Sequence, residues 1–190
     1  MRAAGASARL RERSRAVNVA ITGFMGAGKS TAGRRLARLL HIPFIDTDAE
    51  IERRFGAIAE IFAREGEAAF RAYEARVIDQ VSSEGPRVIA VGGGAVVNPA
   101  NRDALRRNGV IVNLALKAET AHRRVAHRSH RPLLGPAPSL ETIRGIMADR
   151  ASAYADNDLS IAVDSKTAPA IAHIIARWYR RRAAVARPAQ

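Results

Sequence analysis

Five short apolar segments alternate along the chain with longer segments in which apolar residues recur at helical spacing. Short continuous apolar runs are typical of strands buried on both faces, and the longer patterns are typical of amphipathic helices. The expected strands are Val17–Thr22, Pro43–Asp46, Arg87–Val91, Val110–Leu114 and Leu159–Val163. The expected helices are Ser30–Leu40, Ala49–Phe55, Ile58–Val81, Pro99–Asn108, Ala118–His127, Leu140–Tyr154 and Ala168–Arg180. Because strands and helices alternate, the pattern predicts an α/β fold with a parallel sheet covered on both faces.

The segment Gly23-Phe24-Met25-Gly26-Ala27-Gly28-Lys29-Ser30-Thr31 joins the first expected strand to the first expected helix. It matches the phosphate-binding pattern G-x-x-x-x-G-K-[ST], in which backbone N–H groups and the helix N-terminus face one anion. Lys29 would reach the β- and γ-phosphates of a nucleotide, and Ser30 would hold Mg²⁺. The alternative is a glycine turn that only caps a helix, and the flanking strand and helix favour a nucleotide site.

Two carboxylates follow the second expected strand, in Phe44-Ile45-Asp46-Thr47-Asp48. Ligands of open parallel sheets bind beyond the carboxyl ends of the strands. One carboxylate would help to hold Mg²⁺, and the other would accept a proton from a hydroxyl that attacks phosphorus. The alternative is that Asp46 or Thr47 caps the following helix, and both roles are compatible.

Three glycines, Gly92 to Gly94, follow the third expected strand. Glycine is entropically costly, so this run indicates a close approach to the backbone, with a loose turn as the alternative. Arg71 and Arg150 are candidates for a pair that binds a small carboxylate through the guanidinium fork, although an average arginine lies on the surface. The segment from Arg128 to Ser139 is rich in proline and basic residues, and it is expected to be a surface loop or a lid over the nucleotide.

The net charge of +13 is concentrated at the two ends of the chain. Residues 1–15 hold five arginines and one glutamate, and residues 177–190 hold five arginines and no acidic residue. We interpret these ends as solvated and expect no nucleic-acid partner; binding of the ends to nucleic acid or to a membrane surface is the alternative. We expect one domain over residues 16–180, a basic extension over 1–15 and a basic tail over 181–190.

Apolar runs in the chain are shorter than the roughly 18 residues of a membrane helix, and the chain has no cysteine. We therefore expect a cytoplasmic protein that works without a membrane and without thiol chemistry. The arginine-rich start bears a faint likeness to an organellar transit peptide, but a plain extension is the preferred interpretation.

Taken together, these motifs resemble shikimate kinase, in the nucleoside-monophosphate-kinase-like branch of P-loop proteins. The resemblance rests on GFMGAGKST, FIDTDAEIE, IAEIFAREGEAAFRAYE, VIAVGGGAVVNPANR and RPLL, in that order, and covers roughly residues 17–175. It implies a three-layer α/β/α fold with a five-stranded parallel sheet in the order 2-3-1-4-5 and a lid at about residues 124–138. It also implies phosphorylation of the 3-hydroxyl of shikimate by ATP with Mg²⁺, by an enzyme expected to be a monomer.

The resemblance also implies roles for individual residues. The nucleotide-binding set is Gly26, Ala27, Gly28, Lys29, Ser30, Thr31, Arg124 and Arg131, with Arg124 against adenine and Arg131 in the lid. The shikimate-binding set is Asp48, Arg71, Gly93, Gly94 and Arg150. The expected metal ligands are Ser30 and Asp46, and the expected catalytic residues are Asp48 as the base, Lys29 and Arg131.

Two other functions are compatible with parts of the sequence. Another small-molecule kinase, such as a gluconate kinase, would share the phosphate loop, but that family lacks the triple glycine and the EGEAAFR segment. A catalytically silent ATP-binding regulator would be expected to lose the base or a substrate arginine, and this chain has candidates for all of them.

Overall fold

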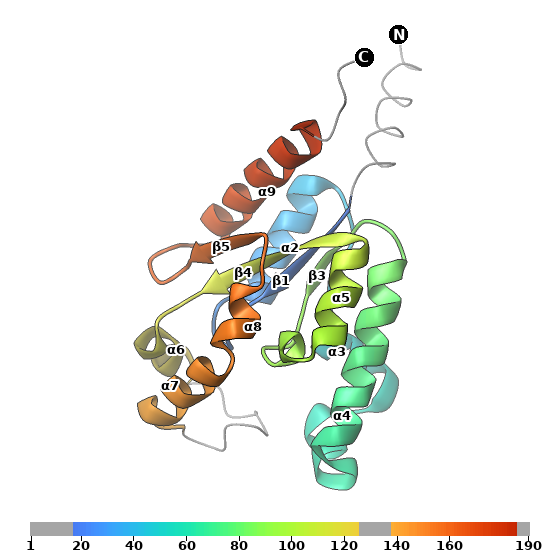
Figure 1. The fold of residues 1–190 in the computed structure, drawn as a ribbon, viewed down its shortest axis with the longest axis vertical. Helices are drawn as coiled ribbons and strands as arrows, with labels where there is room; N and C mark the ends of the chain where they lie inside the picture. The colour runs from blue at the N-terminus through green and yellow to red at the C-terminus, as the bar shows by residue number, and fades with distance from the viewer. Residues whose placement is uncertain (1–16, 126–137, 186–190) are drawn as a thin grey trace.

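A five-stranded parallel sheet forms the centre of the molecule (Figure 1). The computed structural model describes residues 17–125 and 138–185. The strands are β1 (Asn18–Thr22), β2 (Phe44–Asp46), β3 (Val88–Ala90), β4 (Gly109–Ala115) and β5 (Leu159–Ala162). Their order is β2-β3-β1-β4-β5, and every neighbouring pair is parallel. The expected fold class and strand order are therefore confirmed.

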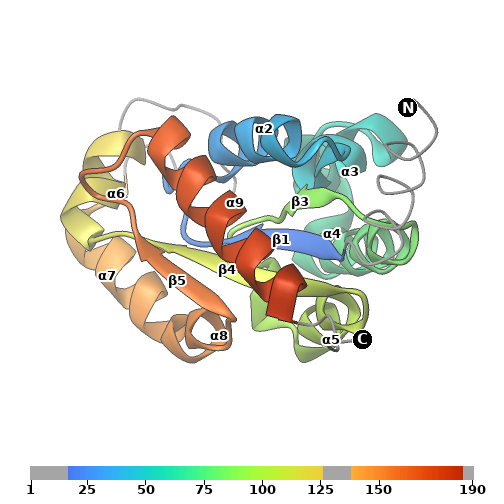
Figure 2. The ribbon, with the colours of Figure 1, turned by 90° about the horizontal axis from the view of Figure 1, so that it is seen from above.

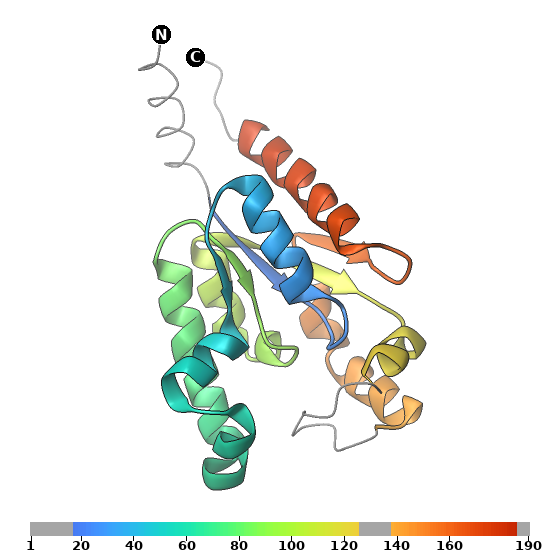
Figure 3. The same cartoon turned by 180° about the vertical axis from the view of Figure 1, so that it is seen from behind.

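Helices cover both faces of this sheet. They are α2 (Lys29–Leu40), α3 (Thr47–Phe55), α4 (Ile58–Ser83), α5 (Pro99–Arg107), α6 (Ala118–Val125), α7 (Leu140–Asp149), α8 (Ala151–Ala155) and α9 (Ala168–Val185), with a 3₁₀ turn η1 (Ala95–Val97). Helices α2 and α9 lie side by side on one face, and α4 and α5 lie on the other (Figures 2 and 3). The helices thus form the two outer layers of an α/β/α sandwich.

The central strand β1 explains why its sequence is almost continuously apolar. Val19, Ala20 and Ile21 are fully buried, because β1 lies between β3 and β4 and both faces of the sheet are covered. The one buried polar residue at its start, Asn18, donates to Ser82 O at 2.7 Å and accepts from Arg87 N at 3.0 Å. These bonds satisfy the buried amide and tie β1 to the end of α4 and to the start of β3.

Three helices differ from the sequence-based expectation. Helix α4 contains a kink at Gly66, whose φ of 81° lies in the left-handed region. The expected single helix over 140–154 is broken at Arg150, which has φ −99° and ψ 0° and separates α7 from α8. Helix α9 continues past its expected end at Arg180 and reaches Val185. Within the described residues, no helix has the length and apolarity needed to cross a membrane.

Candidate active site

The phosphate loop, Gly23 to Thr31, comprises the turn between β1 and α2 and the first residues of α2. Its glycines at 23, 26 and 28 all have positive φ, of 135°, 82° and 88°. A Cβ on Gly23 would lie 2.5 Å from Leu114 O, so the turn packs against the backbone of β4. Glycine is therefore required here both for backbone conformation and for space, as the sequence pattern predicts.

Lys29 is the first residue of α2, and its ammonium turns back over the loop. Its Nζ donates to Gly23 O at 2.9 Å and to Phe24 O at 3.4 Å. Ala27 is buried and closes the loop by donating its N–H to Phe24 O at 3.1 Å, whereas Thr31 is exposed in the first turn of α2. The ammonium, the loop and the N-terminus of α2 together form a compact positive region.

Ser30 and Asp46 come from different elements and meet at the mouth of this loop. Ser30 Oγ donates to Asp46 Oδ2 at 2.5 Å. Asp46 is also the N-cap of α3, since its Oδ1 accepts from Asp48 N at 3.2 Å and Ala49 N at 3.5 Å. The N-cap interpretation of Asp46 is thus confirmed, and the same carboxylate has one oxygen turned toward the loop.

The pair also fits a magnesium ion. Mg²⁺ prefers oxygen ligands and keeps most of its water, so it needs only one or two protein ligands beside nucleotide phosphates. Ser30 and Asp46 supply such a hydroxyl and carboxylate next to the phosphate loop. No cluster of three or more His, Cys, Asp or Glu suited to a metal occurs among the residues described.

Asp48 and Glu74 both approach Gly92, just beyond the end of β3. A Cβ on Gly92 would lie 2.9 Å from Asp48 Oδ1 and 2.7 Å from Glu74 Oε1. Gly92 N donates to Thr47 Oγ1 at 3.2 Å, which fixes the strand end against the start of α3. A close approach to this glycine was predicted, and here it involves two carboxylates of the protein itself.

Glu74 is 1 % exposed, and its Oε2 accepts from Arg71 Nη1 at 2.8 Å. Burial raises the pKa of Glu74, and the negative charge of Asp48 raises it further, while Arg71 and Arg150 oppose the change. Sequence reasoning did not single out Glu74. Its position three residues after Arg71 on one helix was the available signal, because residues at that spacing share a helix face.

Arg71 is held in place on the α4 side of the strand end. Besides Glu74, its guanidinium binds Glu67 Oε1 through Nη2 at 2.9 Å and lies 5.1 Å from the centre of the Phe70 ring. A Cβ on Gly94 would come within 2.9 Å of Arg71 Nη2. The Arg71 guanidinium therefore lies directly against Gly94, where a side chain would collide with it.

Arg150 approaches the same strand end from the opposite side. Its Nη1 donates to Gly93 O at 3.3 Å, and the hydroxyl of Tyr154 donates to the same carbonyl. Gly93 in turn faces the phosphate loop, since its Cβ would lie 3.5 Å from Met25 N and 3.7 Å from Gly23 O. The break between α7 and α8 at Arg150 thus presents its side chain to the glycine run. Tyr154 was not anticipated from sequence.

Arg124 lies on the nucleotide side of the site. Its Nη1 donates to Gly26 O at 3.0 Å, and its Nη2 donates to Asp164 O at 3.3 Å and Val163 O at 3.4 Å. It therefore links the phosphate loop to the segment after β5. Arg131 and most of the expected lid at about residues 124–138 lie outside the described residues.

The structure thus brings together two groups of predicted residues at one edge of the sheet. The phosphate loop follows β1, and its Ser30 is bonded to Asp46 at the end of β2, while Asp48, Arg71 and Arg150 surround the glycines beyond β3. Gly93 joins them, because it faces the loop on one side and its carbonyl accepts from Arg150 on the other. A site of this composition can bind a nucleotide phosphate beside a small acidic acceptor.

Comparison with known proteins agrees with this geometry. The family model for shikimate kinase matches residues 25–180. The shikimate kinase of Geobacter metallireducens is 46% identical over 79% of this chain and 84% of its own length. A shikimate kinase from Acinetobacter baumannii, solved in complex with shikimate, has a TM-score of 0.84 and 35% identity over 88% of this chain and 94% of its own.

A gluconokinase from Sinorhizobium meliloti is a more distant structural neighbour. Its TM-score is 0.61 over 89% of this chain and 94% of its own, and its sequence is only 17% identical. That likeness concerns the fold alone, whereas the family model and the identities of the shikimate kinases extend over most of the chain. The chain belongs to the shikimate kinase family.

Proposed function

We propose that the protein transfers the γ-phosphoryl group of ATP to the 3-hydroxyl of shikimate, giving ADP and shikimate 3-phosphate. The single observation that carries this proposal is the position of Gly93. Its Cα faces the phosphate loop, with Met25 N 3.5 Å from the position of a Cβ, and its carbonyl accepts from Arg150. The donor phosphate and a carboxylate acceptor would therefore meet at one strand end.

The donor half of the site would act through the backbone N–H groups of Gly26 to Thr31 and through Lys29. These groups face the region where negative charge increases on the transferred oxygens, and they are preorganised by the glycine turn. Ser30 and Asp46 are the proposed magnesium ligands, and Mg²⁺ bound there would neutralise charge on the β- and γ-phosphates. Arg124, bonded to the loop carbonyl of Gly26, would border the nucleotide.

The acceptor half would bind shikimate through Arg71 and Arg150, whose guanidinium groups suit its carboxylate. Glu67 and Glu74 hold Arg71 in position, and Gly93 O holds Arg150, so both cations are oriented by the protein. The backbone of Gly93 and Gly94 would form the floor beneath the ring. With the carboxylate fixed on one side, the ring hydroxyls would face Asp48 and the phosphate loop.

Asp48 is the proposed base. As the 3-hydroxyl oxygen forms a bond to the γ-phosphorus, the bond from that phosphorus to the β–γ bridging oxygen breaks, and the hydroxyl proton passes to the Asp48 carboxylate. Asp48 is exposed to this edge of the sheet, next to Gly92. Arg131 is proposed, from the family resemblance, to add positive charge at the phosphates.

The test is release of ADP, followed by a coupled assay, in the presence of shikimate and of a panel of sugar acids that includes gluconate. We expect turnover that depends on shikimate and on Mg²⁺, with little turnover on gluconate. Folded protein that binds ATP but shows no shikimate-dependent release of ADP would overturn the proposal and favour a silent ATP-binding regulator.

We further propose that the enzyme acts as a monomer in the cytoplasm. The described groups from the phosphate loop to Arg150 meet within one chain, which supports a site formed by a single copy. ATP, the phosphate donor, is available in that compartment. Light scattering after gel filtration would check the mass, and a dimer with activity lost on dilution would contradict this part.

A further inference from the structure

The face of the molecule formed by α2 and α9 contains basic side chains and no acidic ones. There is no Asp or Glu in residues 30–45 or in residues 165–190. The two helices lie side by side on one face of the sheet (Figure 3), and Arg180 Nη2 on α9 donates to Leu39 O on α2 at 2.8 Å. The basic residues at exposed positions of the two helices are Arg34, Arg35, Arg38, Arg177, Arg180, Arg181 and Arg182. We refer to these seven as the α2/α9 basic face.

Most described arginines elsewhere in the domain form ion pairs; no ion pair is formed by Arg76, Arg123, Arg124 and Arg150 within the described residues. Arg53, Arg54, Arg64, Arg71, Arg87, Arg102, Arg106, Arg107 and Arg144 each form an ion pair with a carboxylate. Among the described residues, only Arg182 of the α2/α9 basic face forms an ion pair, to Asp158 Oδ1 at 3.6 Å. The repulsion among its like charges is therefore hardly compensated within the described residues, and an anionic partner would reduce it.

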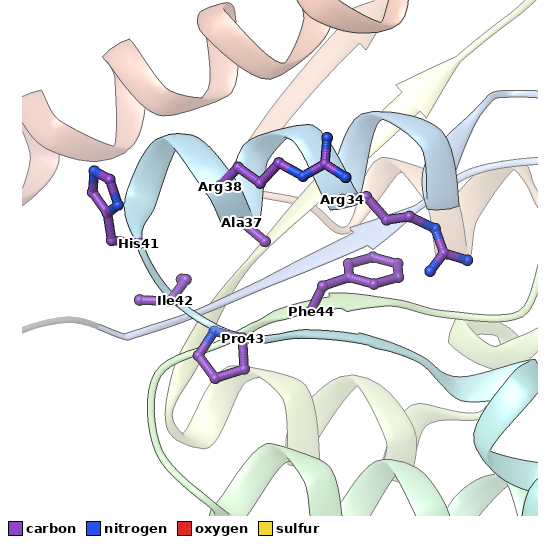
Figure 4. Close-up of a pocket in the computed structure, with 7 residues that line it drawn as sticks. All are labelled: Arg34, Ala37, Arg38, His41, Ile42, Pro43 and Phe44. Atoms are coloured by element: carbon purple, nitrogen blue, oxygen red, sulfur yellow. The ribbon is translucent and has the colours of Figure 1, made fainter.

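A groove of about 820 Å³ runs along the edge of this face, between α2 and the start of β2. Arg34, Arg38 and His41 line one wall, and Phe44 lines the other, as Figure 4 shows. The Arg34 guanidinium lies 4.9 Å from the centre of the Phe44 ring. The Phe44 ring is half-buried, and its remaining surface lies beside these guanidinium groups. Guanidinium groups next to an accessible aromatic ring are a combination that binds phosphate and stacks on bases.

The arrangement of charge favours a ligand with repeated phosphates. Arg34 and Arg38 are one helical turn apart, as are Arg177 and Arg181, so each helix presents its cations at a regular interval. Arginine also binds phosphate oxygens in a bidentate manner, which lysine does not. A lipid surface fits less well, because Ile174, 37% exposed, is the one large apolar side chain described as exposed on these helices.

We propose that the α2/α9 basic face binds single-stranded nucleic acid through its phosphodiester backbone, independently of the kinase site. The phosphates would lie along the arginines of α2 and α9, and a base would stack on Phe44. The surface contains none of the residues assigned to ATP or shikimate. RNA and DNA share the backbone that this surface would recognise, so we expect both to bind.

The test compares two triple variants of the full chain that have the same net charge. Arg34→Gln/Arg38→Gln/Arg177→Gln removes three cations from the basic face. Arg53→Gln/Arg76→Gln/Arg107→Gln removes three exposed arginines from α3, α4 and α5, outside this face. Binding of short fluorescent single-stranded RNA and DNA is measured by anisotropy over a range of salt concentrations, together with shikimate-dependent ADP release.

We expect the first variant to bind at least roughly a hundredfold more weakly near 50 mM salt and to show a salt dependence lower by about two in log–log slope, since each single-strand phosphate contact contributes about 0.7. The second variant should bind like the original protein, and both should keep kinase activity, which shows that they are folded. Equal binding by the two variants would overturn the proposal, because the affinity would then arise from the total charge of the protein or from residues 1–15. Binding to phosphatidylserine vesicles without binding to either oligonucleotide would overturn it in favour of a membrane surface.

Discussion

The two halves of the active site are built by different means. The phosphate half is one continuous segment. In it, the backbone conformation at Gly23, Gly26 and Gly28 sets the direction of the backbone N–H groups that would bind phosphate. The acceptor half is assembled from side chains that lie far apart in sequence, such as Asp48, Arg71 and Arg150, and these depend on packing for their positions. A local motif can therefore identify the donor, whereas the acceptor is specified only by the folded chain.

This difference predicts separable effects of mutation. Changes in the acceptor half should impair use of shikimate while nucleotide binding is preserved, because the glycine turn does not depend on those side chains. Changes in the phosphate half should impair phosphoryl transfer from every acceptor.

Asp48→Asn should have the largest effect, because it removes the proposed base without removing the bulk of the side chain. Loss of general-base catalysis typically lowers turnover by about 10²- to 10⁴-fold. Steady-state kinetics should show this fall in kcat, while titration with a fluorescent ATP analogue should give nearly unchanged affinity. Asp103→Asn, on the exposed side of α5, is the matched control. Near-normal turnover of Asp48→Asn would remove Asp48 from its role.

Lys29→Met tests the phosphate half. It replaces the ammonium that lies over the loop carbonyls with an uncharged chain of similar length. Loss of one preorganised charged donor typically lowers kcat by about 10²- to 10³-fold. Shikimate binding, measured by calorimetry in the absence of nucleotide, should be preserved. Lys117→Met is the control, since Lys117 is exposed after β4. If Lys29→Met weakened shikimate binding as strongly as turnover, the two halves would not be separable.

Arg150→Ala should act mainly on the shikimate KM. A hydrogen bond to a charged group contributes about 1.5–3 kcal/mol, which corresponds to a rise in KM of roughly 10- to 150-fold. The KM for ATP should change little, because the guanidinium bonds Gly93 O and lies on the acceptor side of that strand end. Arg144→Ala, an exposed arginine on α7, is the control. If only the KM for ATP changed, Arg150 would have to be assigned to the nucleotide half of the site.

Glu74→Gln should have the smallest effect, and it should appear in the pH dependence of stability. Burial raises the pKa of Glu74 above its ordinary value of 4.5, so the folded state holds its proton more tightly than the unfolded state. The contribution of Glu74 to stability is therefore lost as pH rises from about 4.5 through the raised pKa. Glutamine does not titrate, so the variant lacks this loss.

Urea unfolding over a pH series measures the effect. The free energy of unfolding of the original protein, minus that of Glu74→Gln, should decrease as pH rises above 4.5. Glu67→Gln controls for loss of a contact to Arg71, because it removes the exposed carboxylate on the same guanidinium. If the difference increased with pH, the pKa of Glu74 would be lowered, and the charges of Arg71 and Arg150 would outweigh the effect of burial on it.

The sequence predicted the strands, their parallel arrangement and the phosphate loop because these features are local. Buried parallel strands are continuous apolar runs, and the glycines of the loop are required by positive φ at fixed positions. Residue chemistry made Asp48, Arg71 and Arg150 candidates, and the family resemblance assigned their roles. Their convergence on the glycine run required the fold. Glu74 was missed because a buried carboxylate looks, in sequence, like any acidic residue on a helix.

The interruption between α7 and α8 shows a limit of periodicity. Residues 140–154 have a helical pattern with no glycine or proline after Gly145, so nothing local indicates a break at Arg150. In the structure, the bond from Arg150 to Gly93 O and that from Tyr154 tie this segment to the strand end. Tertiary contacts of this kind override local helix preference.

The last helix also fastens the start of the domain. The hydroxyl of Tyr179 accepts from Val17 N and donates to Val17 O, both at 2.9 Å, so the first described residue of the chain is bonded to α9. The points where the chain enters and leaves the domain are therefore neighbours. A short peptide joining them would allow new termini to be opened in a surface loop, or the whole kinase to be inserted as a module into another protein.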